Sequence, residues 1–405
     1  MDAGLIASKR LEEIAKCSLP GDGVTRLPFT DEHKQANRLI AEWMKQAGMK
    51  VWLDAAGTLI GRLEGQGARA SRTFILGSHQ DSVRNGGRFD GIMGVALACL
   101  AVEQAFSKGA KLDFSIEVHA YADEEGVRFP TALLGPRALA GSCDSQVFEM
   151  RDNDNVPLED ALATFGGNPG AIHSLKRNPG DTLGYLEMHI EQGPVLEQEN
   201  LAVGIVTAIC GIERNTLTLH GKTGHAGTVP MQGRRDALVP AARIIIEAES
   251  EARRLENLRA TTGTLSMLPG AVNQIPETVS FSLEIRSPDD TVRSSFRSHM
   301  VDYANRVAAE QGCRITIDRS YEQLAQKCDP RFLTLLEDAS ISVQGRSISL
   351  PSGATHDASA MAGLCPVGML FVRCRGGVSH VPEEYASSED MGMAIAIASR
   401  FLRSL

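Results

Sequence analysis

The sequence predicts an α/β protein in which a mixed, mostly parallel sheet forms the larger domain and a ferredoxin-like α+β domain is inserted into it. The first observation is length: at roughly 150 residues per domain, 405 residues suffice for two or three domains. The second is that apolar strands alternate with helices early in the chain, which is typical of parallel sheets. The third is a middle segment with the order β-α-β-β-α-β.

The first part of the chain begins with a capped helix. Thr30 precedes apolar residues that recur at i, i+3, i+4, i+7 and i+8, which predicts a helix ending near Gly48. A buried strand is predicted next at 73–76 and a helix at 92–106. A second strand is predicted at 114–122 and a third at 187–191. Residues 152–178, rich in Gly, Asn and Pro, are predicted to form a long irregular connection.

The order of predicted strands and helices changes after Gly211. Leu217 and Leu219 alternate with polar neighbours, which predicts a strand with one buried face. A helix is predicted next at 237–255, followed by strands at 262–268 and 279–286. A second helix at 291–311 and a strand at 314–318 complete the order. We therefore assign 212–325 to the inserted domain, and 1–211 with 326–405 to the larger one. The larger domain then closes with a helix, a strand and a helix, at 331–341, 367–373 and from Ser388 onwards.

Composition and charge exclude several classes of partner. Apolar residues make up 43% and charged residues 22%, as in ordinary globular proteins. Lys and Arg total 41 against 50 Asp and Glu, a net charge of −9, so neither nucleic acid nor an anionic membrane is expected as a partner. The 8 cysteines form no C-x-x-C pair, which argues against a disulfide framework or a thiolate zinc site. No secretion signal or membrane span is recognised, so a cytoplasmic protein is expected.

Imidazoles and carboxylates recur where predicted strands end or glycine-rich turns lie. They are His79 in GSHQDS, Asp90 in GGRFDG, Glu124 and Glu125 in DEEG, His189 in EMHIE and His380 in GGVSH. Ligands gather at the carboxyl ends of strands in open α/β sheets, so we expect these side chains to meet. Imidazole and carboxylate donors suit divalent cations. Asp90, on its glycine-flanked turn, is the candidate for the oxygen that two neighbouring ions must share.

Each of these residues alone has a simpler explanation. An isolated histidine is more often a hydrogen-bonded core or surface residue, and adjacent glutamates more often lie in a solvated turn. Their recurrence at the ends of successive elements favours the metal site. The sequence holds no G-x-S-x-G elbow, no evident cysteine nucleophile motif and no Walker-type loop, which disfavours a nucleophilic enzyme or a nucleotide-binding protein.

Longer stretches that span almost the whole chain carry a family resemblance. They are GSHQDSVRNGGRFDGIMGV (77–95), DEEGVRFP (123–130), LGPRALAG (134–141), EMHIEQGPVLE (187–197), GHAGTVPMQGRRDA (224–237), VNQIP (272–276), SGATHDA (352–358) and GGVSH (376–380). In these stretches the chain resembles the hydantoinase/carbamoylase branch of the metal-dependent M20 peptidase-like amidohydrolases. That group contains N-carbamoyl-L-amino-acid hydrolases, allantoate amidohydrolases and β-ureidopropionases.

The resemblance implies two divalent ions per subunit. His79, Asp90 and His189 would hold one ion, and Asp90, Glu125 and His380 the other. Zinc, manganese, cobalt and nickel all accept such ligands, so the metal stays open. The larger domain would be the catalytic domain, and the inserted domain would serve as a lid and join two subunits in a homodimer.

The resemblance also implies roles beside the ions. Asp81 would orient the imidazole of His79. Glu124 would be the general base that takes a proton from water and passes it to the leaving nitrogen. His225, in the inserted domain, would stabilise the oxyanion of the tetrahedral intermediate.

Four further positions match substrate-binding residues of the family. Arg286, on the polar face of a predicted strand, would form a fork for a substrate carboxylate, and Gln192, Asn273 and the Gly353 backbone would contact the rest. N-carbamoyl-L-amino acids are the expected substrates and allantoate the close alternative, towards which RCR at 373–375 points slightly. An M20 exopeptidase or N-acyl-amino-acid deacylase is a further alternative. A binding protein without catalysis is disfavoured because the base and all ligand positions are intact.

Overall fold

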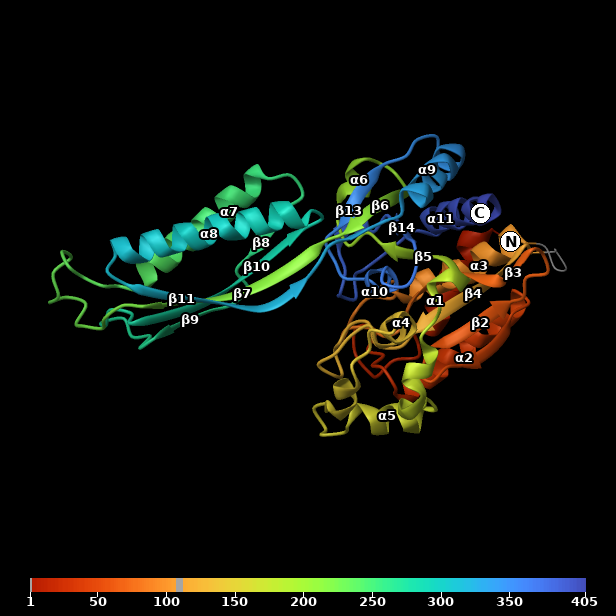
Figure 1. The fold of residues 1–405 in the computed structure, drawn as a ribbon, viewed down its shortest axis with the longest axis horizontal. Coiled ribbons are helices and arrows are strands. Elements are labelled where there is room, and N and C mark those ends of the chain that lie inside the picture. The colour runs from red at the N-terminus through yellow and green to blue at the C-terminus, as the bar shows by residue number, and fades with distance from the viewer. Residues whose placement is uncertain (1, 107–111) are drawn as a thin grey trace. The chain divides into compact units, whose positions relative to one another are not determined.

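The computed structural model describes residues 2–106 and 112–405, which form two compact units (Figure 1). The first unit comprises Met1–Thr207, Cys328–Leu350 and Thr355–Leu405, and the second comprises Ala208–Lys327 and Pro351–Ala354. Each unit has its own hydrophobic core. The functions expected of the second unit, as a lid and as a dimerisation domain, stay predictions.

The first unit is built on a mixed sheet whose strands follow the order β1-β2-β4-β3-β5-β14-β6-β12, in which the two-residue strand β12 (Gln326–Lys327) pairs with β6. The strands are Lys50–Leu53 (β1), Leu59–Leu63 (β2), Arg69–His79 (β3), Phe114–Tyr121 (β4), Thr182–Ile190 (β5), Val203–Ile209 (β6) and Val367–Val372 (β14), and Ser349–Ser352 (β13) pairs with β6. The four central strands β4, β3, β5 and β14 are parallel, while β1, β2 and β6 pair antiparallel at the flanks. The predicted α/β class with a mixed, largely parallel sheet is confirmed.

Helices cover both faces of this sheet. Those that share the main core with it are Ala3–Ile14 (α1), Asp31–Gln46 (α2), Ile92–Ala105 (α3), Pro330–Gln344 (α9) and Ser388–Ser404 (α11). The opposite face carries Leu134–Ala140 (α4) and Asp357–Met361 (α10), and Val195–Gln198 (α6) follows β5. Every residue of β4 is buried, as expected of a strand covered on both sides. The Thr30 hydroxyl caps α2 as predicted, accepting the His33 backbone N–H at 3.3 Å.

The prediction of an irregular segment at 152–178 is wrong. The segment contains a helix, Leu158–Phe165 (α5), and a 3₁₀-helix, Pro169–Leu175. Leu158, Leu162 and Phe165 recur on one face of α5 and are buried in a small second core. Helical spacing of apolar residues therefore outweighed the Gly- and Pro-rich composition.

The parallel register brings the carboxyl ends of the central strands to one edge of the sheet. His79 pairs with Tyr121 across β3 and β4, and Val372 pairs with Ile190 across β14 and β5. The segments that follow β4 and β14 therefore begin beside the end of β3 and the end of β5. This register explains why residues far apart in the sequence can form one site.

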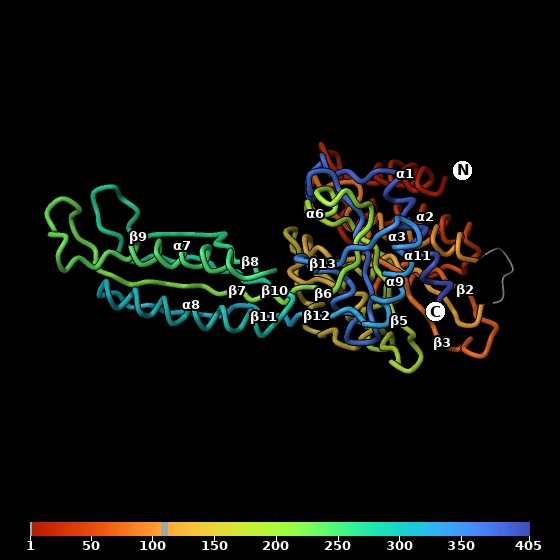
Figure 2. Tube along the Cα trace, turned by 90° about the horizontal axis from the view of Figure 1, so that it is seen from above, coloured from red at the N-terminus to blue at the C-terminus, as the bar shows by residue number. Residues whose placement is uncertain are grey.

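The second unit is a sheet with both helices on one face (Figures 1 and 2). Its elements are Gly211–His220 (β7), Leu238–Arg254 (α7), Arg259–Thr261 (β8), Leu265–Leu268 (β9), Thr278–Ser287 (β10), Asp290–Glu310 (α8), Arg314–Gln323 (β11) and Gln326–Lys327 (β12). The strand order is β11-β7-β10-β8, and β9 also pairs with β10. All these pairings are antiparallel.

The strand predicted at 262–268 is confirmed only over Leu265–Leu268 (β9), and a separate short strand, β8, precedes it. Both strands pair with β10. The break lies where the Ser282 hydroxyl accepts the backbone N–H groups of Gly263 and Thr264, at 3.1 and 3.0 Å. The Ser282 side chain thus takes the N–H groups of these two residues, while the Ser282 N–H still donates to the Thr264 carbonyl at 3.1 Å.

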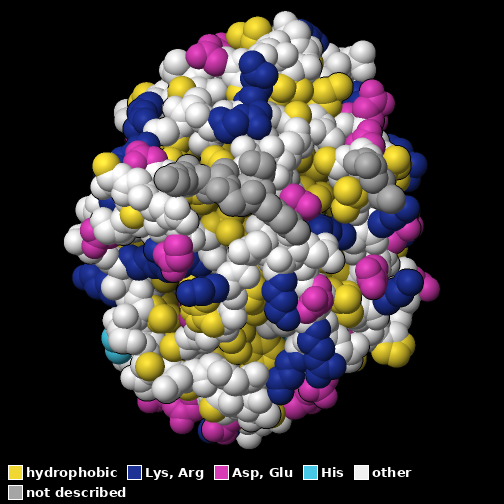
Figure 3. Space-filling view, turned by 90° about the vertical axis from the view of Figure 1, so that its right-hand side faces the viewer, with side chains coloured by type: hydrophobic (Ala, Val, Ile, Leu, Met, Phe, Trp, Pro, Cys, Tyr) yellow, Lys and Arg dark blue, Asp and Glu magenta, His cyan; other side chains and the backbone are white. Residues whose placement is uncertain are grey.

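All eight cysteines are free. Over residues 2–106 and 112–405, no helix is both long and apolar enough to span a bilayer. On the face that Figure 3 shows, basic and acidic side chains are interspersed.

Candidate metal centre

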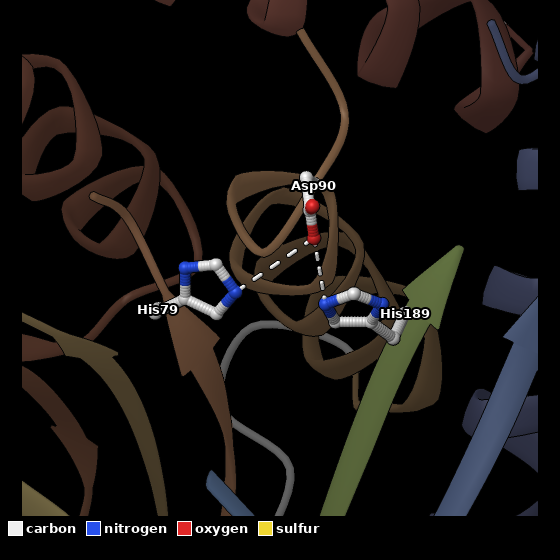
Figure 4. A group of neighbouring side chains, drawn as sticks. All are labelled: His79, Asp90 and His189. Atoms are coloured by element: carbon white, nitrogen blue, oxygen red, sulfur yellow. Dashed lines mark ion pairs between the residues drawn. The ribbon is translucent and has the colours of Figure 1, made fainter. Parts of the chain in front are cut away.

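Five of the predicted side chains converge in two groups that share Asp90. In the first group, the ligand atoms of His79, Asp90 and His189 all lie within 4.8 Å of one another (Figure 4). In the second group, Asp90, Glu125 and His380 meet the same limit. The two groups are those that the family resemblance implied.

The first group is buried, and its histidines come from neighbouring parallel strands. His79 ends β3, His189 lies near the end of β5, and Asp90 lies in the turn before α3. The His189 Nε2 is 3.0 Å from Asp90 Oδ1, and the His79 Nε2 is 3.8 Å from the same oxygen. Figure 4 shows both rings directing a nitrogen to that oxygen.

Backbone carbonyls fix the tautomer of both histidines. The Nδ1 of His79 is 3.0 Å from the Asp81 carbonyl, and the Nδ1 of His189 is 3.0 Å from the Ile190 carbonyl. A carbonyl only accepts, so Nδ1 carries a proton in each ring, and Nε2 is the nitrogen directed towards Asp90, which can bind a cation once it is deprotonated. Histidines that bind metals are oriented in this way.

Asp81 holds His79 differently from the prediction. Its main-chain carbonyl takes the 3.0 Å hydrogen bond, while its carboxylate Oδ1 is 3.5 Å from the imidazole. That carboxylate accepts the backbone N–H groups of Glu124 and Glu125, at 3.1 and 3.2 Å. Asp81 therefore supports both His79 and the turn that carries the two glutamates.

The second group is more open. The His380 Nε2 lies 3.0 Å from Asp90 Oδ2 and 4.0 Å from Glu125 Oε2, and the His380 side chain is 50% exposed. The other Glu125 oxygen, Oε1, is buried without a hydrogen-bond partner among residues 2–106 and 112–405. A buried carboxylate oxygen needs a donor or a cation.

The donor set fits a pair of divalent cations. Ligand bonds of about 2.1 Å in a tetrahedral site place donor atoms roughly 3.4 Å apart, and the separations measured to Asp90 run from 3.0 to 3.8 Å. The two Asp90 oxygens face different groups, Oδ1 the first and Oδ2 the second. One carboxylate can thus serve both ions, as paired sites require.

The electrostatics describe acidic groups crowded into a buried space. Burial, reinforced by the neighbouring Glu125 carboxylate, raises the pKa of Glu124 well above its ordinary value. Burial and Asp90 raise the pKa of Glu125 to about 7, while the hydrogen bond to Asp90 raises that of His380 to about 9. Burial alone would raise the pKa of Asp90, but His189 and the other imidazoles hold it well below its usual range. A cation would offset the same crowding.

Glu124 stands beside the first group without belonging to either. Its Oε2 is 3.9 Å from the His79 Nε2, and its side chain is buried. This leaves Glu124 close to the ligand atoms and available for proton transfer, as a general base requires.

Gln192 also lies at the second group. Its Nε2 donates to Asp90 Oδ2 at 3.1 Å and to Ser379 Oγ at 3.3 Å, and it is 3.3 Å from the His380 Nε2. The residue adopts a φ of 55°, in the left-handed region. Of the predicted substrate-binding residues, it is the one that the first unit holds at the ligands.

The remaining predicted residues belong to the second unit. His225 and Asn273 lie in exposed loops that pair with each other, since the Ala226 N–H donates to the Asn273 carbonyl at 2.9 Å. Arg286, on β10, donates through Nη1 to the Gly353 carbonyl at 2.7 Å. The structure thus brings these four residues together in two pairs.

Sequence reasoning gave no role to four residues around the site: Glu187, His356, Asp357 and Glu384. Glu187 and His356 form a third candidate ligand group with His189, whose ring centroid is 4.5 Å from that of His356. His356 stands in the SGATHDA stretch that carries part of the family resemblance. Asp357, its neighbour, is fully buried, and Glu384 contacts the Asp90 turn. The spacing of Glu384 from His380 in GGVSHVPEE was the available signal.

Comparisons with known proteins show what the chain as a whole is similar to. A family model described as peptidase family M20/M25/M40 matches residues 75–404. The N-carbamoyl-L-amino acid amidohydrolase of Geobacillus stearothermophilus is 40% identical over 96% of this chain and 95% of its own. Allantoate deiminase 2 of Glycine max is 35% identical over 98% of this chain and 89% of its own. A crystal structure of a hydantoinase/carbamoylase family amidase from Burkholderia multivorans matches with a TM-score of 0.91 and 31% identity, covering 99% of this chain and 97% of that one.

Proposed function

Because the chain belongs to peptidase family M20/M25/M40, we propose that it hydrolyses a carbamoyl or ureido C–N bond of a small, carboxylate-bearing molecule with two divalent cations. The observation that carries this proposal is the shared carboxylate of Asp90, which has an imidazole nitrogen 3.0 Å from each oxygen. His79, Asp90 and His189 would hold one cation, and Asp90, Glu125 and His380 the other.

The cations, when bound, would polarise the scissile carbonyl and lower the pKa of a nearby water. Glu124 accepts a proton from that water and delivers it to the leaving nitrogen, because its carboxylate is in neither ligand group. Asp81 keeps Glu124 in place through the 3.1 Å hydrogen bond to the Glu124 N–H. His225 is the proposed donor to the developing oxyanion.

Arg286 is the proposed anchor for the substrate carboxylate. Its Nε donates to Glu284 Oε1 at 2.8 Å and its Nη1 to the Gly353 carbonyl at 2.7 Å, which hold the guanidinium plane in one orientation. A planar fork held in this way suits bidentate recognition of a carboxylate. Gln192, Asn273 and the Gly353 backbone would contact the remainder of the substrate.

N-carbamoyl-L-amino acids are the first proposed substrates and allantoate the second. Relatives with both names match nearly the whole chain, at 40% and 35% identity. Both kinds of molecule present a ureido group and a carboxylate, so the same ligands and the same arginine serve either. The native metal, whether zinc, manganese, cobalt or nickel, stays open because each accepts these donors.

We also propose a homodimer formed through the second unit. Among the described residues, strand β9 pairs with β10 alone, and its residues Leu265, Met267 and Leu268 are 48%, 43% and 66% exposed. An apolar edge strand of this kind favours pairing with another chain. Sedimentation analysis that finds only monomers at micromolar concentration would contradict the dimer.

A substrate screen tests the function. The protein is stripped of metal, reconstituted with each of the four ions, and assayed for ammonia release from N-carbamoyl-α-amino acids, allantoate and N-carbamoyl-β-alanine. Dipeptides and N-acetyl amino acids, assayed for amine release at the same metal loading, represent exopeptidase and deacylase activity. We expect turnover of a ureido substrate that chelator abolishes. Turnover that survives exhaustive chelation, or that is confined to peptides, would contradict the proposal.

Arg286→Ala is expected to raise KM for carboxylate substrates by about ten- to a hundredfold with a smaller change in kcat, because a charge-assisted hydrogen bond is worth roughly 1.5–3 kcal/mol. Steady-state kinetics on an N-carbamoyl amino acid and on its carboxamide analogue would measure the effect. The carboxamide, which lacks the charge, should lose far less. Arg214→Ala is the matched control, because Arg214 contacts the other oxygen of the same Glu284 at 2.7 Å. Equal losses in both variants would argue for a role in folding.

A further inference from the structure

Glu384 is a buried carboxylate that binds two separate segments of the site. It is 2% exposed and lies between His380 and α11. Its Oε1 accepts the backbone N–H groups of Phe89 and Asp90, at 2.9 and 3.0 Å. Its Oε2 accepts the Ser379 hydroxyl at 2.7 Å and the His380 N–H at 3.4 Å. One carboxylate therefore joins the Asp90 turn to the His380 loop.

The Asp90 turn is shaped to admit this carboxylate. A Cβ placed on Gly87 would lie 2.1 Å from Glu384 Oε1 and 2.2 Å from its carboxyl carbon. Any larger residue at position 87 would therefore displace the carboxylate or the turn. Gly87 of the GGRFDG stretch is thus required by a residue that lies near the other end of the chain.

Both ligands that Glu384 contacts lie off the sheet, as Glu125 does. His79 and His189 lie on strands, where ladder pairing sets their positions. Asp90 and His380 lie in loops, and His380 is half exposed with a φ of 64°. Gln192 and the Ser379 hydroxyl link the two loops through the Asp90 side chain, whereas Glu384 links their backbones.

We propose that Glu384 is a positioning residue that fixes the His380 loop against the Asp90 turn and thereby assembles the Asp90, Glu125 and His380 group. This inference rests on the proposed function, because it assumes that the group binds a cation. The hydrogen bonds of Glu384 to these two ligands go to the backbone N–H groups of Asp90 and His380, not to the side-chain atoms that would face a cation. Partners of this kind typically change metal affinity by 10–100-fold.

Titration calorimetry of the metal-free, full-length protein with Mn²⁺ tests the inference. The wild type is expected to take up two ions. Glu384→Ala should raise the dissociation constant of the more weakly bound ion at least tenfold. The dissociation constant of the more tightly bound ion should rise less, because His79 and His189 stay on their strands. Glu383→Ala is the matched control, since Glu383 is the exposed neighbour, and it should bind both ions like the wild type.

Glu384→Gln guards against a folding defect. Glutamine keeps the volume and one carbonyl oxygen, which can still accept from Phe89 and Asp90 while its NH₂ faces the Ser379 hydroxyl. Its affinity for the weaker ion should fall between those of the wild type and the alanine variant. Activity of both variants should recover as Mn²⁺ is raised, which a catalytic role or a general loss of stability would not produce.

The outcomes separate this inference from the proposed function. If the wild type binds two ions and both Glu384 variants bind them with unchanged affinity, the positioning role is overturned while the function stands. An equal loss of both ions in Glu384→Gln would likewise overturn it, because the effect would not be specific to the His380 group. If the wild type binds no pair of ions, the proposed function itself fails.

Discussion

Replacing Glu124 by glutamine is expected to lower kcat by about 10²–10⁴-fold, the usual contribution of a general acid–base residue. The amide is isosteric with the carboxylate but cannot accept the proton of the attacking water. Glu124 lies 3.9 Å from the His79 Nε2 yet belongs to neither ligand group, so both ions should still bind. Steady-state kinetics of the metal-saturated variant, with metal content measured by mass spectrometry, would check both expectations.

Glu125→Gln is the matched control for this experiment. The two glutamates are adjacent, and their N–H groups contact the same Asp81 carboxylate, so both substitutions disturb the turn alike. Glu125, however, is a member of the second ligand group. Its variant should lose affinity for one ion and regain activity as metal is raised, whereas Glu124→Gln should not. Wild-type kcat in Glu124→Gln would remove Glu124 as the base, and loss of an ion there would make it a ligand.

Two of the five predicted metal ligands could be placed because their positions follow from regular structure. His79 and His189 end buried parallel strands, and such strands are recognisable from continuous apolar runs. Once the sheet is parallel, the ends of β3, β4 and β5 must share an edge, so residues after β4 are expected nearby. The family resemblance added the pairing of ligands into two groups, and the family itself is confirmed.

The supporting residues could not be predicted in the same way. Asp81 holds His79 through its main-chain carbonyl, a contact that any residue type could make, so its side chain gave no signal. Glu384 acts on backbone N–H groups of loops, whose conformations have no sequence periodicity. The break between β8 and β9 depends on the Ser282 hydroxyl of a facing strand. For Glu384 and Ser282 the deciding contact joins segments that are separated in the chain, and no local periodicity encodes it.

Asp90→Asn should also lower both metal binding and activity strongly, because asparagine has one side-chain oxygen where two are needed to contact the two ligand groups. Asp90 Oδ1 faces His79 and His189, and Oδ2 faces His380. The single amide oxygen can face only one of these groups, and it carries no charge. We expect at most one ion per subunit and a loss of about two to four orders of magnitude in kcat/KM, since a Lewis-acid cation is worth several kcal/mol of transition-state stabilisation. Metal analysis and steady-state kinetics of the purified variant would measure both.

Single-group variants show whether the effect of Asp90 comes from sharing. His380→Ala removes a ligand of the second group only, and His79→Ala one of the first only. If Asp90 is the common ligand, each of these variants should lose affinity mainly for one ion. When the amide oxygen of the Asp90→Asn variant serves the first group, adding His380→Ala should lower kcat/KM little further than Asp90→Asn alone. Residues that act as a unit behave non-additively in this way. Two fully bound ions in Asp90→Asn would show that the ions do not share this carboxylate, and the two groups would then be separate sites.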